Sequence, residues 1–351
     1  MSGDCVKLTT YFGERDRCDG RFLGDALLEL YGRNGVPASV LLRATEGFGI
    51  KHRLHTQQLL TLSEDLPLVS VAIDARERIE SLVPEVAEIS THGLITLERA
   101  RFATAETEVP NDSQAKLTVY VARGQRAAQA AVGVLRGHGV SGATAILGID
   151  GTRHGDRHRA RFFGANLDVP VMVIAVGDNA PIRAALPELA TAVDRPLMTL
   201  ERIQVCKRDG QRLAVPPEVP DADTSGLALW QKLMIYSSAR ARHEGEPLHR
   251  ALIRRLRAEG AAGATALRGF WGYHGDHEPH GDSFRSLRRR VPVVTVIVDT
   301  PANVRRWFAI VDELTDEAGL VTSEVVPALR ATGPETEHGG LALAERWGGD
   351  A

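Results

Sequence analysis

Glycine and basic residues gather in one segment of the chain, where they could hold an anionic ligand. Gly47-Phe48-Gly49 is followed closely by Arg53 and His55. Glycine lets the backbone approach a ligand closely, and arginine and histidine side chains can donate hydrogen bonds to phosphate. A turn that requires positive φ would select glycine equally well. The segment therefore predicts a ligand-binding loop, with a glycine turn as the alternative explanation.

Two later segments have a related composition at comparable places in the chain. Both carry paired glycines, but the residues between and around them differ, so three sites of this kind would not be chemically equivalent. We expect one or two of them to bind ligand and the rest to be structural. The candidate ligand-binding residues are Gly47, Phe48, Gly49, Arg53, His55, Gly148, Gly151, Gly269, Gly272 and Tyr273.

A histidine cluster in the third of these segments offers a metal site as an alternative. His274, His277 and His280 lie close together in sequence, with Asp276 among them. Imidazole and carboxylate are good ligands for divalent transition metals. Their spacing matches no zinc template, and histidines in a glycine-rich loop need no metal. We therefore expect no resident metal or cofactor, and keep these three histidines as the alternative.

The elements that must position these segments are revealed by an internal repeat, which decides the architecture. Four blocks recur in the same order three times. The first block opens with lysine and the last closes with glutamate. The first blocks are Lys7-Leu8-Thr9-Thr10-Tyr11, Lys116-Leu117-Thr118-Val119-Tyr120 and Lys232-Leu233-Met234-Ile235-Tyr236, and the last end at Glu98, Glu201 and Glu324.

The middle blocks and the stretches between them complete the pattern. The second blocks begin at Gly35, Gly139 and Gly260, and the third at Pro67, Pro170 and Pro292. All four blocks read as strands, whereas apolar residues at helical spacing precede the second block and follow the third. Glycine should stop each first helix, and Thr300 followed by Pro301 predicts the start of a later helix. The predicted unit is β-α-β-β-α-β, the ferredoxin-like motif.

Three such units imply a particular packing. Helices would cover one face of each antiparallel sheet, and the other face must be buried against something. We predict an α+β pseudo-trimer within one monomeric chain, with three independent domains as the alternative. The predicted divisions are residues 5–103, 115–207 and 228–330, followed by a flexible tail at 331–351.

Composition narrows the function classes. A net charge of −3 with 42 basic residues describes a mixed surface, so it favours no nucleic-acid partner. Three cysteines without C-x-x-C spacing argue against a disulfide framework. No run of 18 apolar residues and no signal-peptide pattern is present, so we expect a cytoplasmic location. No Walker sequence, nucleophile elbow or H-E-x-x-H motif appears, which favours a non-enzymatic protein over an enzyme on the same scaffold.

The first unit resembles a small family of uncharacterised PII-like proteins, and the two later units keep its strand and helix blocks. The residues that carry the resemblance are Tyr11-Phe12-Gly13-Glu14, Thr45-Glu46-Gly47-Phe48-Gly49, His52-Arg53-Leu54-His55-Thr56, Leu62-Ser63-Glu64-Asp65-Leu66-Pro67 and Gly93-Leu94-Ile95-Thr96-Leu97-Glu98.

The resemblance implies a function as well as a fold. PII-like proteins are usually homotrimers that bind adenine nucleotides or related effectors in clefts between subunits. Their long loop after the second strand senses the ligand and contacts a target, and this branch is often associated with fluoride-exporting membrane channels. The resemblance thus implies a regulator that binds AMP, ADP or ATP at inter-domain clefts and acts on a partner such as a membrane transporter or channel.

Overall fold

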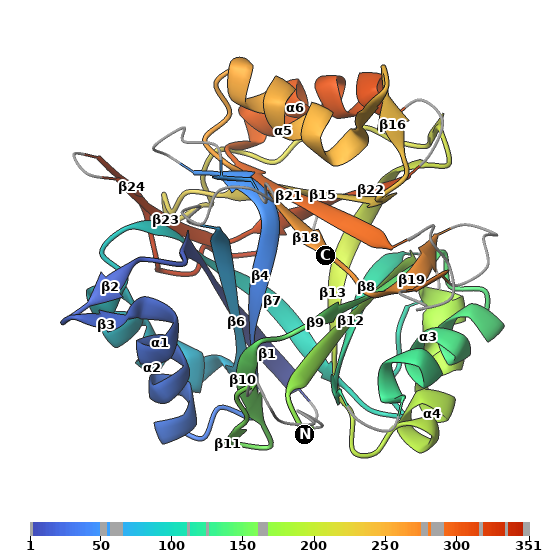
Figure 1. The fold of residues 1–351 in the computed structure, drawn as a ribbon, viewed down its shortest axis with the longest axis horizontal. Helices are drawn as coiled ribbons and strands as arrows, with labels where there is room; N and C mark the ends of the chain where they lie inside the picture. Colours follow the sequence, from blue (N-terminus) through green and yellow to red (C-terminus); the bar gives the residue numbers. More distant parts are fainter. Residues whose placement is uncertain are drawn as a thin grey trace.

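A computed structural model places three helix pairs around a centre made of strands (Figure 1). It describes residues 3–49, 66–110, 113–123, 126–160, 168–274, 291–315, 319–333 and 336–346, and the backbone of 55–56 and 280–281. The described residues contain six α-helices, two in each tandem unit, and strands predominate. We call the units 1, 2 and 3 in chain order. The chain is thus three tandem mixed α/β units.

Unit 1 shows the pattern that the other units repeat. Its sheet has the order β4-β6-β1-β7, and every pairing is antiparallel. Its elements are β1 (Gly3–Gly13), β2 (Arg17–Cys18), β3 (Arg21–Phe22), α1 (Leu23–Arg33), β4 (Ala38–Phe48), β5 (His55–Thr56), β6 (Pro67–Ala75), α2 (Arg76–Ile89) and β7 (Gly93–Ala103).

Units 2 and 3 have the corresponding elements. Those of unit 2 are β8 (Gln114–Ala122), α3 (Ala127–Gly137), β9 (Gly142–Leu147), β10 (Asp150–Arg153), β11 (Asp156–Arg157), β12 (Pro170–Asp178), α4 (Asn179–Ala192), β13 (Leu197–Arg208) and β14 (Gln211–Arg212). Those of unit 3 are β15 (Trp230–Ser238), β16 (Arg242–His243), β17 (Glu246–Pro247), α5 (Leu248–Ala258), β18 (Ala264–Arg268), β19 (Trp271–His274), β20 (His280–Gly281), β21 (Pro292–Asp299), α6 (Pro301–Leu314) and β22 (Leu320–Val326), followed by β23 (Ala328–Thr332) and β24 (Glu337–Gly340).

Local sequence signals account for the helix ends. Gly35, Gly139 and Gly260 follow α1, α3 and α5 and have positive φ, which glycine adopts without strain. Thr300 is the N-cap of α6, where its hydroxyl accepts a hydrogen bond from the Asn303 N–H at 3.3 Å, and Pro301 is the first helical residue. The predicted helix stops and the predicted start are confirmed.

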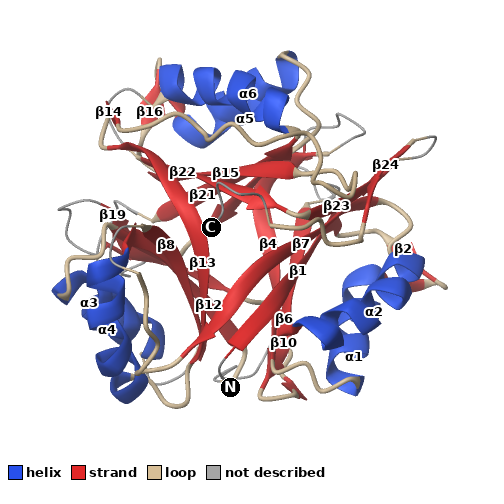
Figure 2. Cartoon of the chain, turned by 180° about the vertical axis from the view of Figure 1, so that it is seen from behind, coloured by secondary structure: helices blue, strands red, loops and turns tan. Residues whose placement is uncertain are grey.

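The cores form two layers around the sheets. Each helix pair packs on the outer face of its own sheet and gives each unit a separate apolar cluster. A further cluster at the centre combines inward-facing residues of all three units, such as Leu42, Met172 and Val294. Figure 2 shows the helices outside and the strands inside. The inward faces are therefore buried against one another.

The strands are also joined edge to edge, which corrects the predicted ferredoxin-like pseudo-trimer. A closed circuit of pairings runs through β4, β6, β1, β7, β13, β22, β15, β21, β18 and back to β4, a barrel of nine strands. The prediction had three sheets that meet only through their faces. Sheet edges present unpaired N–H and C=O groups, and the neighbouring unit satisfies them here.

The tail after unit 3 also departs from the prediction of a flexible segment. β23 pairs with β7 of unit 1, and β24 folds back on β23. Further on, the Ala344 side chain is fully buried, and its carbonyl accepts a hydrogen bond from Arg99 of unit 1. The tail up to residue 346 therefore adds strands to unit 1, because the edge of β7 needs partners.

The barrel closure predicts that Phe48 stabilises the chain from outside its own unit. Phe48 ends β4 of unit 1, is 3% exposed, and lies in the apolar core of unit 3. Phe48→Ala should lower the free energy of unfolding by about 3–5 kcal/mol. The control Phe22→Ala, at a side chain 45% exposed, should cost less than about 1 kcal/mol. Urea denaturation measures both free energies of unfolding, and an equal decrease in the two variants would contradict the burial of Phe48 in the core of unit 3.

Candidate functional site

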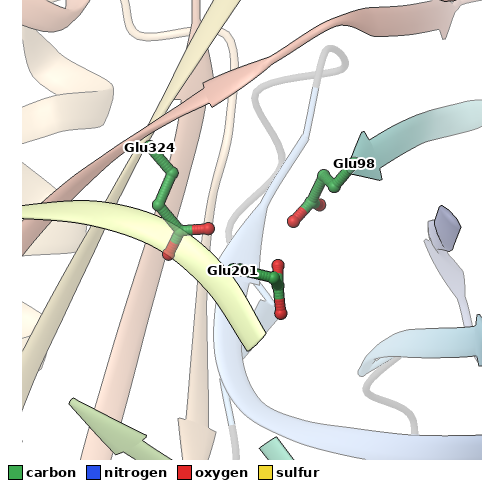
Figure 3. A group of neighbouring side chains, drawn as sticks. All are labelled: Glu98, Glu201 and Glu324. Carbon is green, nitrogen blue, oxygen red and sulfur yellow. The ribbon is translucent and has the colours of Figure 1, made fainter. Parts of the chain in front are cut away.

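Six buried charges meet at the centre, where the three repeats come together. The lysine that opens each repeat is the cross-strand partner of the glutamate that closes it: Lys7 with Glu98, Lys116 with Glu201, and Lys232 with Glu324. Figure 3 shows the three glutamate side chains converging from different strands. We call these six residues the Lys–Glu ring.

Each lysine of the ring bridges two units. Within a unit, the lysine ammonium nitrogen lies 2.6 Å from a glutamate carboxylate oxygen in the pair Lys7–Glu98. The same distance is 3.0 Å in Lys116–Glu201 and 2.9 Å in Lys232–Glu324. Each lysine also contacts the glutamate of another unit: Lys7 with Glu201, Lys116 with Glu324, and Lys232 with Glu98. Positive and negative groups thus alternate in a closed cycle.

Burial and ion pairing oppose each other in the ring: burial prevails at Lys116, where it lowers the pKa to about 8, whereas the ion pairs prevail at Glu98 and Lys7. Burial raises the pKa of Glu98, but Lys232 and Lys7 outweigh it and hold that pKa well below its usual range. Burial lowers the pKa of Lys7, yet Glu201 and Glu98 raise it well above its ordinary value. Such charges are tolerated in a core only when they are paired.

The three glutamates are close enough together to suggest a metal site, but the lysines make that chemistry unfavourable. Their carboxylate oxygens lie within 4.8 Å of one another. Every one of these carboxylates already contacts two ammonium groups, and three positive charges balance three negative ones. A cation would have to displace a lysine. The ring is therefore a structural centre.

The predicted glycines lie at contacts between units. Gly47 belongs to β4 and pairs with Thr265 in β18 of unit 3; a Cβ added there would lie 2.8 Å from the Ala264 carbonyl oxygen. Gly151 of unit 2 pairs with β4 of unit 1, and Gly272 of unit 3 pairs with β9 of unit 2; a Cβ at either would collide with a backbone carbonyl. Close backbone approach accounts for these glycines.

The remaining candidate ligand-binding residues lie at the same three contacts between units. Gly148 and Gly269 have almost no room for a Cβ, and the Tyr273 hydroxyl donates a hydrogen bond to the Val140 carbonyl at 2.9 Å. Phe48 and Gly49 lie at the contact between units 1 and 3. The three sets of glycines thus lie at three different places, and their binding of a ligand stays a prediction.

The basic and histidine candidates are only partly described. Arg53 and His277 lie outside the described residues. The backbone of His55 pairs with Gly47, and the backbone of His280 pairs with Gly272. His274 ends β19, with its Nδ1 3.8 Å from an Asp209 carboxylate oxygen. Among the described residues, the metal-ligating types converge only in the Lys–Glu ring.

A cavity of about 570 Å³ lies between units 1 and 3 and includes Phe48 and Gly49. We call it the unit 1–unit 3 cleft. Its walls come from the end of β1, the start of β7, the α5–β18 turn, the start of β15 and the β23–β24 hairpin. Aromatic and aliphatic side chains dominate it, including Phe12, Leu94 and Trp230. A volume of this size suits a small organic molecule.

Few charged groups line this cleft. Among the described lining residues, two carry carboxylates, Asp16 and Asp299, and none is lysine or arginine. Asp299 has both oxygens occupied: one accepts from the Thr300 N–H and the Asn303 amide, the other from the Trp307 indole. Its role is to fix the start of α6.

Comparison with known proteins assigns the three units to a family. The model of the family described as "Uncharacterized ACR, COG1993", DUF190, matches residues 5–102, 114–205 and 230–328. The chain belongs to this family. It carries three tandem copies of an uncharacterised PII-like domain.

Two curated relatives are single-copy in length. One UPF0166 protein of Aquifex aeolicus (strain VF5) is 31% identical over 98 residues, which is 28% of this chain and 90% of the relative. A second UPF0166 protein of the same organism is 29% identical over 79 residues, 22% of this chain and 81% of the relative. This DUF190 chain thus contains about three lengths of such a relative. In its described part, no helix has the length and apolar character needed to cross a membrane.

The Lys–Glu ring is what the sequence interpretation missed. The six residues were visible as the first and last residues of each repeat, in strands that are otherwise largely apolar. A charge kept in all three copies of a buried strand is a usable signal, because an unpaired charge there would be prohibitive. Asp16 and Trp230 carry no comparable signal, since nothing in the sequence indicates that they share a cavity.

The ring predicts a large penalty for losing one charge. Lys116→Met leaves Glu201 and Glu324 each with one cation fewer, so the free energy of unfolding should fall by about 3–5 kcal/mol. Arg76→Met removes an exposed pair with Glu80 and should cost at most about 1 kcal/mol. Adding Glu201→Gln to Lys116→Met should recover part of the loss. Similar decreases in the free energy of unfolding for Lys116→Met and Arg76→Met would show that the ring charges do not need their buried partners.

Proposed function

We propose that this DUF190 chain is a non-enzymatic regulator that binds a small effector with a flat ring system in the unit 1–unit 3 cleft. An adenine nucleotide, AMP, ADP or ATP, is the effector class to test. Binding would change how the chain interacts with a partner protein. The observation that carries the proposal is the position of the cleft, which is formed by two units together.

The shape of the cleft supports a ligand with an apolar, planar body. Phe12 and Trp230 lie in opposite units and offer aromatic surface, and Leu94 adds aliphatic surface. Aromatic walls contribute much burial with little loss of conformational freedom. Gly49 lines the same cleft and leads in sequence to Lys51 and Arg53, which could meet phosphate groups.

A regulator fits the described chemistry better than an enzyme. Asp299, one of the two carboxylates, already accepts three hydrogen bonds from its own unit, which disfavours a role as a base. A ligand held between two units binds best when those units are correctly placed, so it shifts the population of their arrangements. That is the behaviour required of a sensor.

The identity of the partner rests on the family resemblance. A membrane transporter or a fluoride channel is the class that the resemblance implies, and we propose it as the target. We also propose that the chain acts as a monomer, because its three units already provide the interfaces that separate subunits would otherwise form.

A thermal-shift titration with AMP, ADP and ATP tests the proposal. At a concentration of 100 times Kd, a bound nucleotide should stabilise the protein by about 2.7 kcal/mol and raise Tm. Ala262→Trp should abolish the shift, because this exposed residue lines the cleft and the indole would fill it.

Ala309→Trp provides a matched control, since it adds the same side chain to an exposed site of α6 that does not line the cleft. The control should keep the full nucleotide-induced shift. No shift with any nucleotide in the unmodified protein would refute the proposed effector class. An unchanged shift in Ala262→Trp would move the site away from this cleft.

A further inference from the structure

We infer that Asp16 selects the effector by accepting a hydrogen bond from an amino group on its ring. This inference rests on the proposed function and names the group that the unit 1–unit 3 cleft recognises. It concerns one of the two carboxylates in this cavity, which is also lined by His92 and His338 among many apolar residues.

Asp16 is held rigidly in the turn after β1. Its backbone N–H donates to the Gly13 carbonyl at 3.1 Å, and its own carbonyl accepts from the Leu23 N–H at 2.8 Å. The Gly13 N–H donates to Asp16 Oδ2, also at 2.8 Å. The carboxylate is therefore fixed in orientation.

The other oxygen of this carboxylate, Oδ1, has no donor among the described residues. Asp299, the second carboxylate of the cleft, accepts three hydrogen bonds and has no comparable capacity. An ionised carboxylate only accepts, so a ligand group opposite Asp16 Oδ1 must be a donor. An amino group satisfies this requirement, whereas a carbonyl oxygen would be repelled.

The repeat shows that the turn does not need this aspartate for folding. Ala241 occupies the corresponding position in unit 3, where its N–H donates to the Ser238 carbonyl at 2.9 Å and its carbonyl accepts from the Leu248 N–H at 2.8 Å. The same two backbone hydrogen bonds thus form without a carboxylate. In unit 2 the corresponding residue in the sequence is Gln125. Asp16 is specific to the one turn of the three that lines this cleft.

Among purines compared at C6, this chemistry favours adenine, since the amino group of guanine lies at C2. Adenine presents an exocyclic amino donor at the position where hypoxanthine and guanine present a carbonyl oxygen. The pair AMP and inosine monophosphate carries the same phosphate and differs at C6 and at the adjacent N1, which bears a hydrogen only in hypoxanthine, so it tests the contact of this ring edge with Asp16.

Calorimetric titration of the full chain with AMP and inosine monophosphate tests the inference. The unmodified protein should bind AMP at least about ten-fold more tightly, as expected for a hydrogen bond to a charged acceptor. In Asp16→Asn the amide oxygen can still accept from Gly13, and its NH₂ group becomes a donor towards the ligand. That variant should lose the preference for AMP or reverse it.

Two further variants control the experiment. Asp19→Asn removes the same charge three residues further on, in the β2–β3 turn, at a residue that does not line the cleft, and it should keep the preference for AMP. Asp16→Ala imitates the turn of unit 3, so its melting temperature without ligand should match that of the unmodified protein within a few degrees.

The outcomes separate this inference from the proposed function. Equal affinity for AMP and inosine monophosphate in the unmodified protein, or an unchanged ratio in Asp16→Asn, overturns the role of Asp16 and leaves nucleotide binding intact. Failure of the unmodified protein to bind either compound overturns the proposed function, and the role of Asp16 with it.

Discussion

The Lys–Glu ring is the interaction on which the rest of the structure depends. A buried charge is costly unless it is paired, and each of the six charges here needs two partners. One partner is always supplied by another unit. Separating any one unit from the other two would therefore leave buried ionised groups without one of their partners. The closed barrel and the central apolar cluster are consistent with this requirement, because both hold the strands that carry the ring close together.

Holding the units in a closed cycle creates surfaces that a single unit does not have. The end of β4 passes into unit 3, where Phe48 enters the core and Gly47 lets the backbones approach. The unit 1–unit 3 cleft opens beside this contact. Because the three copies share one chain, each can change independently, as the corresponding residues Asp16, Gln125 and Ala241 show. A chain of this kind can keep one specialised cleft and use the other contacts for stability.

Much of the fold could be predicted from local signals. Repeated blocks revealed the three units, apolar periodicity placed the helices, and features such as Gly35 and Thr300 marked helix ends, because these depend on neighbours in sequence. The nine-stranded closure and the pairing of β23 with β7 depend on which sheet edges meet, and no local pattern encodes that. The candidate glycines were chosen as ligand-binding positions, and their binding of a ligand stays a prediction. The physical reason for these glycines, contact with a neighbouring unit, required the structure.

The most direct test of this account is native mass spectrometry of the intact chain with AMP. The account predicts a monomeric particle of 38.0 kDa that carries one AMP, since one cleft combines Asp16 with the walls of units 1 and 3. A chain that assembles into trimers, or a monomer that binds three nucleotides with equal affinity or none, would contradict it.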